Sequence, residues 1–151
     1  MAYPERLHHD VPGWVEDGAL FHIRIRSDRD ASLLGSDGAA ARVLLEAARD
    51  YHERKRWFCR LMLIMPDHLH AMVAFPRENR MSSVVGGWKS FLAKTHGISW
   101  QRGFFDHRLR SRKEADECWH YICQNPVRAG LVANAEVWQH IWSPPDITTP
   151  D

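Results

Sequence analysis

The sequence has little cysteine, no long apolar segment and almost no net charge. Its three cysteines are an odd number and lack the close spacing of a zinc-binding knuckle, so we expect reduced thiols rather than a disulfide framework. No run approaches the roughly 20 apolar residues that span a bilayer, and residues 1–6 lack the apolar core of a secretion signal. These absences argue against a disulfide-rich secreted protein and a membrane protein, so we expect a cytoplasmic location and no membrane partner.

The length and composition are those of one globular domain. The chain has 151 residues, of which 44% are hydrophobic and 26% are charged. Proline and glycine near the start predict an irregular lead-in over residues 1–18. We expect a single domain over residues 19–143 and a flexible tail over residues 144–151.

The net charge of +1 hides an uneven distribution of charge. Between residues 77 and 113, nine lysines or arginines stand against two acidic residues, with five Trp or Phe residues among them. Cations can neutralise phosphates and flat rings can stack on unpaired bases, so this stretch predicts a site for single-stranded nucleic acid. The alternative is a solvated basic face above core aromatics.

Residues 20–26 alternate between apolar side chains and the cationic row His22, Arg24 and Arg26, which predicts a strand whose outer face could meet phosphate. A half-exposed strand with basic solvent residues is the alternative. The residues that we expect to contact DNA are Arg24, Arg26, Lys89, Lys94, Arg102, Arg108 and Arg110.

A second alternating segment, residues 68–75, contains two histidines two positions apart. In a strand, His68 and His70 point to one face, and Leu69 and its alternating partners point to the apolar other face. Two imidazoles aimed the same way can bind one metal ion. Two partly exposed sheet histidines are the alternative.

The order of elements predicts an α+β fold. Periodicity and turn signals predict strands and helices in the order strand 20–26, helix 39–56, strand 57–64, strand 68–75, helix 82–96, strand 103–110 and helix 114–125. The first six form a ferredoxin-like βαββαβ arrangement, an antiparallel sheet with two helices on one face. We expect the histidines on the open face of this sheet, and a short helix over residues 137–142.

The helix over residues 114–125 carries a tyrosine and two amides on one flank. Tyr121, Gln124 and Asn125 are three and four residues apart, so a phenol and an amide oxygen can reach one place together. A tyrosine is a poor nucleophile at neutral pH because its pKa is near 10. It needs a phosphorus that a Lewis-acid metal has made more electrophilic. A packed helix tyrosine with a surface hydroxyl is the alternative.

Three segments together resemble a known family. Residues 66–70 (PDHLH), 100–110 (WQRGFFDHRLR) and 121–132 (YICQNPVRAGLV) are similar in order and spacing to the single-tyrosine HUH transposases. The resemblance is closest to the REP-associated tyrosine transposases and covers roughly residues 18–135.

The resemblance implies both a site and a reaction. Tyr121 matches the nucleophile, His68 and His70 match the metal pair, and Asn125 matches the completing amide, with Gln124 as its competitor. The family uses Mg²⁺ or Mn²⁺ and no nucleotide cofactor. It cleaves single-stranded DNA at hairpin-forming or palindromic repeats through a 5′-phosphotyrosine and rejoins strands in DNA transposition and recombination. A monomer is favoured, and a dimer that exchanges tyrosine helices is the other arrangement.

Two other functions stay open at this point. One is a protein that keeps the fold and binds single-stranded or hairpin nucleic acid without cleaving it. The other is a metal-dependent hydrolase that uses water, for which the sequence offers no separate base.

Overall fold

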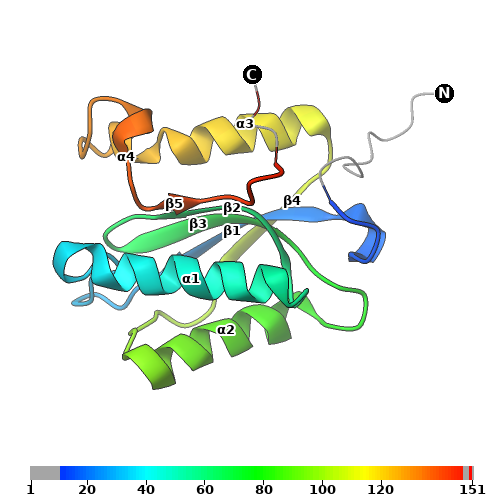
Figure 1. The fold of residues 1–151 in the computed structure, drawn as a ribbon, viewed down its shortest axis with the longest axis horizontal. Helices are drawn as coiled ribbons and strands as arrows, with labels where there is room; N and C mark the ends of the chain where they lie inside the picture. Colours follow the sequence, from blue (N-terminus) through cyan, green and yellow to red (C-terminus); the bar gives the residue numbers. More distant parts are fainter. Residues whose placement is uncertain (1–10, 148–149, 151) are drawn as a thin grey trace.

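A five-stranded antiparallel sheet, in the order β4-β1-β3-β2-β5, lies at the centre of the structure (Figure 1). The computed structural model describes residues 11–147 and residue 150. The strands are β1 (Leu20–Arg26), β2 (Phe58–Ile64), β3 (His68–Ala74), β4 (Phe105–Leu109) and β5 (Ile141–Trp142).

Helices cover both faces of the sheet (Figure 1). The helices are α1 (Ala39–Glu53), α2 (Met81–His96), α3 (Arg112–Cys123) and the short α4 (Asn125–Arg128). The described residues also contain the 3₁₀ turns η2 (Glu16–Gly18), η3 (Ser36–Gly38) and η4 (Ala135–Val137). The predicted βαββαβ order, followed by a helix that carries Tyr121, is confirmed.

Two apolar cores form, one on each face. The first packs α1 and α2 against residues such as Ile23, Leu69 and Val73, which alternate along β1 and β3. The second packs α3 and the segments at both ends of the domain against the opposite side of the same strands, where Leu20 and Met72 lie. Period-two alternation in the strands therefore feeds both cores.

The face that carries the histidines is not open, contrary to the expectation from sequence. Helix α3 lies over it because Ala115, Trp119 and Ile122, spaced along one side of the helix, are buried in the second core. His70 is consequently 2% exposed. A four-stranded sheet with helices on one face would leave Met72 in water, and α3 removes that exposure.

The predicted helix over residues 137–142 is also wrong. Its first residue ends η4, and Ile141 and Trp142 form β5, which pairs with Met62 and Leu63 of β2. The backbone donors and acceptors at the edge of β2 would otherwise lack these partners, and their pairing outweighs local helix preference.

The ends of the domain are partly packed. Val15 is buried in the second core beside η2, and its backbone forms a bridge with Pro76. Pro144 is buried and Ile147 packs against the same core. The parts of the predicted lead-in and tail at residues 1–10, 148–149 and 151 lie outside the described residues. None of the described helices combines the length and apolarity needed to cross a bilayer.

Candidate active site

The strand register sets the site at one end of the α3-covered face. Arg24 of β1 pairs with His70 of β3 on one side and with Phe105 of β4 on the other. The next same-face pair along these strands is Arg26 with His68. Directly paired residues in antiparallel strands point to the same side. The two histidines therefore share a surface with two arginines and an exposed aromatic ring.

His70 is held by another histidine. Its Nδ1 lies 2.9 Å from Nε2 of His22, and the two ring centres are 5.1 Å apart. Burial is the main cause that lowers the pKa of His70 to about 2 and that of His22 to about 4. Both rings are therefore neutral near pH 7. One nitrogen of the pair donates the shared proton and the other accepts it.

His68 is held by a carboxylate and meets the predicted amide. Its Nδ1 lies 2.7 Å from Oδ1 of Asp67, and its Nε2 lies 3.2 Å from Nδ2 of Asn125. The hydrogen bond to His68 is the main cause that lowers the pKa of Asp67. A carboxylate on Nδ1 favours the tautomer with the proton there, which leaves the lone pair on Nε2.

Tyr121 reaches the histidines from α3. Ser111 caps this helix by accepting a hydrogen bond from the backbone N–H of Glu114. Ile122 is buried toward the sheet, whereas the neighbouring Tyr121 is 50% exposed. Its ring centre lies 6.0 Å from that of His70, in an edge-on arrangement. The helix thus presents a solvent-accessible phenol beside the histidine pair.

Arg128 of α4 lies over the ring of Tyr121. Its guanidinium carbon is 4.2 Å from the ring centre, and its Nη2 donates to the backbone carbonyl of Tyr121 at 2.7 Å. A guanidinium above an aromatic face is attracted by the ring quadrupole. Arg128 therefore holds the tyrosine in place and puts a positive charge over its ring.

The donor atoms fit a divalent metal. His68 and His70 both have Nδ1 engaged by a neighbour, which leaves Nε2 as the remaining ring nitrogen on each. A half-turn of the Asn125 carboxamide would present its oxygen to the same place. Imidazole nitrogens suit first-row transition metals and an amide oxygen suits Mn²⁺ or Mg²⁺, so the mixed set is compatible with a divalent ion such as Mn²⁺. Among the described residues, no group of three or more His, Cys, Asp or Glu could hold a metal, so the amide is needed to complete the set.

The two amides that the sequence left open differ in position. Asn125 contacts His68, whereas Gln124 is an exposed residue at the end of α3. The chain turns from α3 into α4 at this point, with Pro126 in the first turn of α4. This turn directs Asn125 inward.

Three of the predicted DNA contacts gather beside the histidines. A hollow of about 380 Å³ is lined by Arg24, Arg26, Arg102, Gln101, Gly103, Phe104 and Phe105. None of these lining residues is acidic. Phe105 is 45% exposed, and the guanidinium of Arg24 lies 5.0 Å from its ring centre. The hollow combines positive charge with an accessible ring.

Lys89, another of the predicted DNA contacts, holds a neighbouring turn of the chain. Its Nζ donates to the backbone carbonyls of Gln101 at 2.9 Å and Gly103 at 2.8 Å. Burial lowers the pKa of this ammonium group. Two of its three N–H donors thus hold the 101–103 turn, which contributes to the lining of the hollow.

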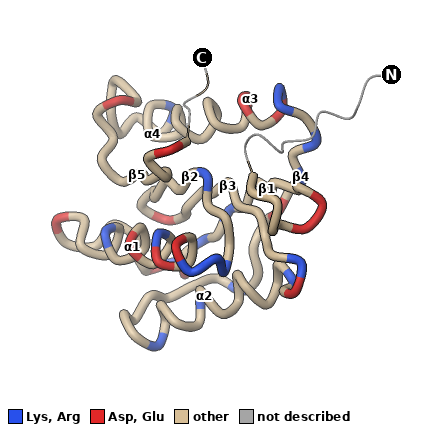
Figure 2. The backbone as a smooth tube through the Cα atoms, turned by 45° about the vertical axis from the view of Figure 1, so that its right-hand side comes forward, with Lys and Arg blue, Asp and Glu red and all other residues tan. Residues whose placement is uncertain are grey.

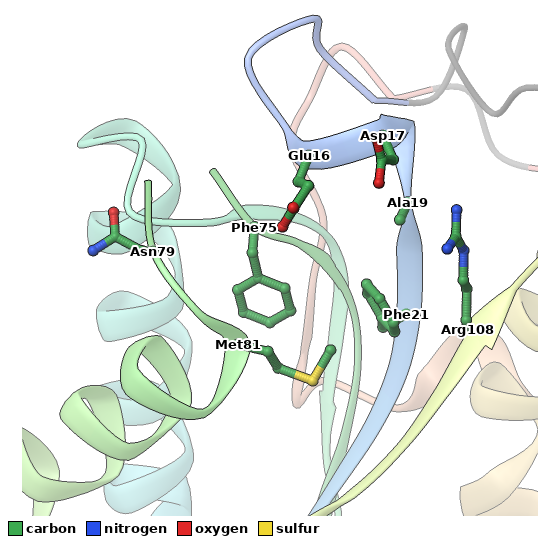
Figure 3. Close-up of a pocket in the computed structure, with 8 residues that line it drawn as sticks. All are labelled: Glu16, Asp17, Ala19, Phe21, Phe75, Asn79, Met81 and Arg108. Carbon is green, nitrogen blue, oxygen red and sulfur yellow. The ribbon is translucent and has the colours of Figure 1, made fainter. Parts of the chain in front are cut away.

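Arg108 and Lys94 lie away from the histidine face. Arg108 pairs with Phe21, which faces the α1–α2 core, and lines a separate hollow together with Glu16 and Asp17 (Figure 3). Lys94 is exposed near the end of α2, in the opposite helical layer. Lys and Arg positions occur in both helical layers (Figure 2). The charge pattern of the sequence therefore could not show which cationic residues lie beside His70 and which lie elsewhere.

Arg110, the last of the predicted contacts, is exposed between β4 and α3. Its Nη1 donates to the backbone carbonyl of Arg108 at 3.3 Å.

Sequence reasoning did not identify Asp67, Arg128 or His22 as neighbours of the candidate site residues. Asp67 directly precedes His68, and Arg128 follows Tyr121 by seven residues, two helical turns, so both offered a signal. His22 was placed in a cationic row, but its contact with His70 depends on strand order, which the local pattern does not contain.

No protein-family model matches the chain, and no curated protein matches it significantly. Among solved structures, a REP-associated tyrosine transposase bound to a REP hairpin is similar, with a TM-score of 0.70 and 19% identity over 93% of this chain and 96% of that one. The chain has the fold of that transposase. A candidate transposase from Deinococcus radiodurans R1 is more distant, with a TM-score of 0.48 and 14% identity over 74% of this chain and 93% of that one.

Proposed function

We propose that this protein is a metal-dependent tyrosine transposase of the HUH type that cleaves and rejoins single-stranded DNA at hairpin-forming repeats. The main observation behind the proposal is that Tyr121 lies beside His70, and that His68 contacts both His70 and Asn125, on one face of the sheet. The fold shared with a transposase bound to a REP hairpin supports the same function and a hairpin partner.

The proposed reaction is a transesterification. The phenol oxygen of Tyr121 attacks a backbone phosphorus and loses its proton, while the bond from phosphorus to the 3′ oxygen breaks and that oxygen leaves as a hydroxyl. The product is a 5′-phosphotyrosine and a free 3′ end. Attack by another 3′ hydroxyl reverses the step and joins strands. Because one phosphoester replaces another, no nucleotide cofactor is required.

The residues around the tyrosine have distinct tasks. A divalent ion, Mg²⁺ or Mn²⁺, held by His68, His70 and Asn125, would supply Lewis-acid polarisation of a phosphoryl oxygen. Arg128 holds the ring of Tyr121 and offers a cation to the phosphate. The hollow between Arg24, Arg26 and Phe105 offers a path for the strand, with guanidinium groups for phosphates and a ring for a base.

A site built from one chain is favoured. In the structure, Tyr121 and His70 of one chain lie with ring centres 6.0 Å apart, so a single chain can supply both the tyrosine and the histidines. We therefore propose an active monomer. A mixture of His68→Ala and Tyr121→Phe proteins should stay inactive, whereas restored activity would indicate helices exchanged in a dimer.

The test is formation of a covalent protein–DNA adduct. Hairpin oligonucleotides with single-stranded flanks are incubated with the protein and Mn²⁺, and a denaturing gel should show a slower band that EDTA prevents. Tyr121→Phe should lose the band completely. Tyr51→Phe is the matched control, because Tyr51 also has an arginine over its ring, at 5.6 Å, but lies on α1.

Three other results would contradict the proposal in different ways. A band that persists in Tyr121→Phe would show that Tyr121 is not the nucleophile. Tight hairpin binding without any band, over a panel of hairpins, favours a binding protein that does not cleave. Cleavage that leaves no band and survives Tyr121→Phe favours hydrolysis by water.

A further inference from the structure

The two histidines of the proposed metal site are supported by different partners. His68 has an exposed carboxylate on its Nδ1, from Asp67. His70, which is almost fully buried, has the imidazole of His22 at the same position, 2.9 Å away. Asp67 is the usual kind of partner for a metal-binding histidine, and His22 occupies the equivalent place for the second ligand.

The hydrogen bond limits how His70 can be protonated. Two neutral imidazoles joined at 2.9 Å share one proton, so either His70 donates from Nδ1 or His22 donates from Nε2. Only the first arrangement leaves the proton off Nε2 of His70, which a metal must approach. The second would place the proton on that nitrogen, because neutral imidazole carries one N–H.

His22 is itself held by its neighbours. Its ring lies edge-on to Phe105 at 5.8 Å and to Tyr121 at 6.3 Å between ring centres. Its backbone is fixed by pairing with Met72 on one side and His107 on the other, in the middle of the sheet. A ring confined in this way can fix the ring to which it is bonded.

We propose that His22 is a positioning residue, which accepts a hydrogen bond from Nδ1 of His70 and so fixes the ring orientation and tautomer that expose Nε2 of His70 to a divalent metal. This inference rests on the proposed metal-dependent function. His22 touches neither the metal nor the phosphate, and it acts through His70. It also connects the metal pair to Tyr121, because its ring contacts both His70 and Tyr121.

The first measurement is Mn²⁺ affinity of the full chain by titration calorimetry, without DNA. His22→Phe keeps the ring volume and removes the acceptor, and it should weaken Mn²⁺ binding about 10- to 100-fold. His22→Gln offers an amide oxygen near the position of Nε2 and should recover most of the affinity. A merely structural ring would give the opposite order, with phenylalanine tolerated better than glutamine.

His107→Phe is the matched control. His107 pairs directly with His22 across β1 and β4, but its Nε2 contacts Glu114 at 2.7 Å. Its replacement should leave Mn²⁺ affinity within about twofold of wild type. If His22→Phe binds Mn²⁺ as tightly as wild type does, the inference is overturned while the proposed function stands. If the wild-type protein binds no Mn²⁺, the proposed function itself fails.

A second measurement needs no variant that might misfold. Long-range ¹H–¹⁵N spectra of the metal-free wild-type protein report which nitrogen of each imidazole carries the proton. We expect the proton of His70 on Nδ1. We expect Nε2 to be unprotonated in both His70 and His68. A proton found on Nε2 of His70 would overturn the inference.

Discussion

Strand β3 presents two different surfaces to the two helical layers. Toward α1 and α2 it buries Leu69, Ala71 and Val73, which join an apolar core. Toward α3 it presents His68 and His70 at one end and apolar residues beyond them. The alternation that buries apolar residues on one side of β3 therefore places the two histidines on the other side.

The difference shows how one face can both fold and function. On the α3 side, the far row of the sheet is apolar, with Leu20 paired to Leu109, and it anchors the helix. The row with Arg24, His70 and Phe105 differs from it, because His70 is buried and polar whereas Phe105 is exposed. The apolar row holds α3 against the sheet, and the other row combines polar groups with an accessible ring.

The largest effect that we expect from breaking this division is on stability. Leu69→Ala should lower the free energy of unfolding by about 2–5 kcal/mol, because Leu69 is fully buried under α1 and α2. The adjacent His68→Ala should cost less, about 1–2 kcal/mol, since it removes two side-chain hydrogen bonds, to Asp67 and to Asn125, without leaving an apolar cavity. Urea unfolding followed by circular dichroism measures both.

The same pair of variants separates folding from function. His68→Ala should remain folded and lose Mn²⁺ binding, whereas Leu69→Ala should bind Mn²⁺ to the extent that it is folded. Equal losses of stability in the two variants would show that the two sides of β3 contribute alike, and the division would not hold.

Much of the fold could be predicted because its signals are local. Alternation predicted the strands that form β1 and β3. Pro66 and Asp67 are residues that favour a tight turn, and they lie in the hairpin between β2 and β3, whose residues Leu63 and His70 pair. The cover on the histidine face and strand β5 could not be predicted in the same way. Both depend on which sheet face and which strand edge remain uncovered after the other elements have packed. The local sequence of a short segment does not indicate this.

The next largest effect should be on DNA affinity, and it compares two exposed phenylalanines. Phe105→Ala should weaken binding of a single-stranded oligonucleotide by about 1–3 kcal/mol, because it removes a ring from the hollow beside His70. Fluorescence anisotropy in Tyr121→Phe protein measures binding without cleavage. Phe91→Ala on α2 is the control, since Phe91 is similarly exposed but lies in the opposite helical layer.

If both phenylalanine variants bind as wild type does, the strand does not use the hollow. If both weaken binding equally, DNA contacts both layers and the α3 side has no special role. Salt dependence adds a second measure. Removing the Arg102 side chain should reduce the slope of log affinity against log salt concentration by the equivalent of about one phosphate contact.

The candidate site was predictable only in part. Tyr121 and Asn125 are one helical turn apart and His68 and His70 are two strand positions apart, so their local geometry follows from sequence. His22 reaches His70 only because β1 lies beside β3 in the sheet. The choice between arginines beside His70 and those elsewhere likewise depends on strand register.

The smallest effect should come from a histidine outside the site. His52 of α1 accepts a hydrogen bond from the backbone N–H of Cys59 through Nδ1, at 3.0 Å, and burial lowers its pKa. The unfolded chain binds this proton more readily, so the stability due to neutral His52 is fully present above about pH 6.5 and is lost as pH falls below it. His52→Asn keeps an acceptor that does not titrate. When the pH falls from 7.5 to 5.5, the free energy of unfolding should decrease less in the His52→Asn protein than in wild type. The two decreases should differ by less than about 1 kcal/mol, because His52 is only half-buried. Urea unfolding at the two pH values measures this difference, and identical losses would show that His52 does not contribute to the acid sensitivity of the fold.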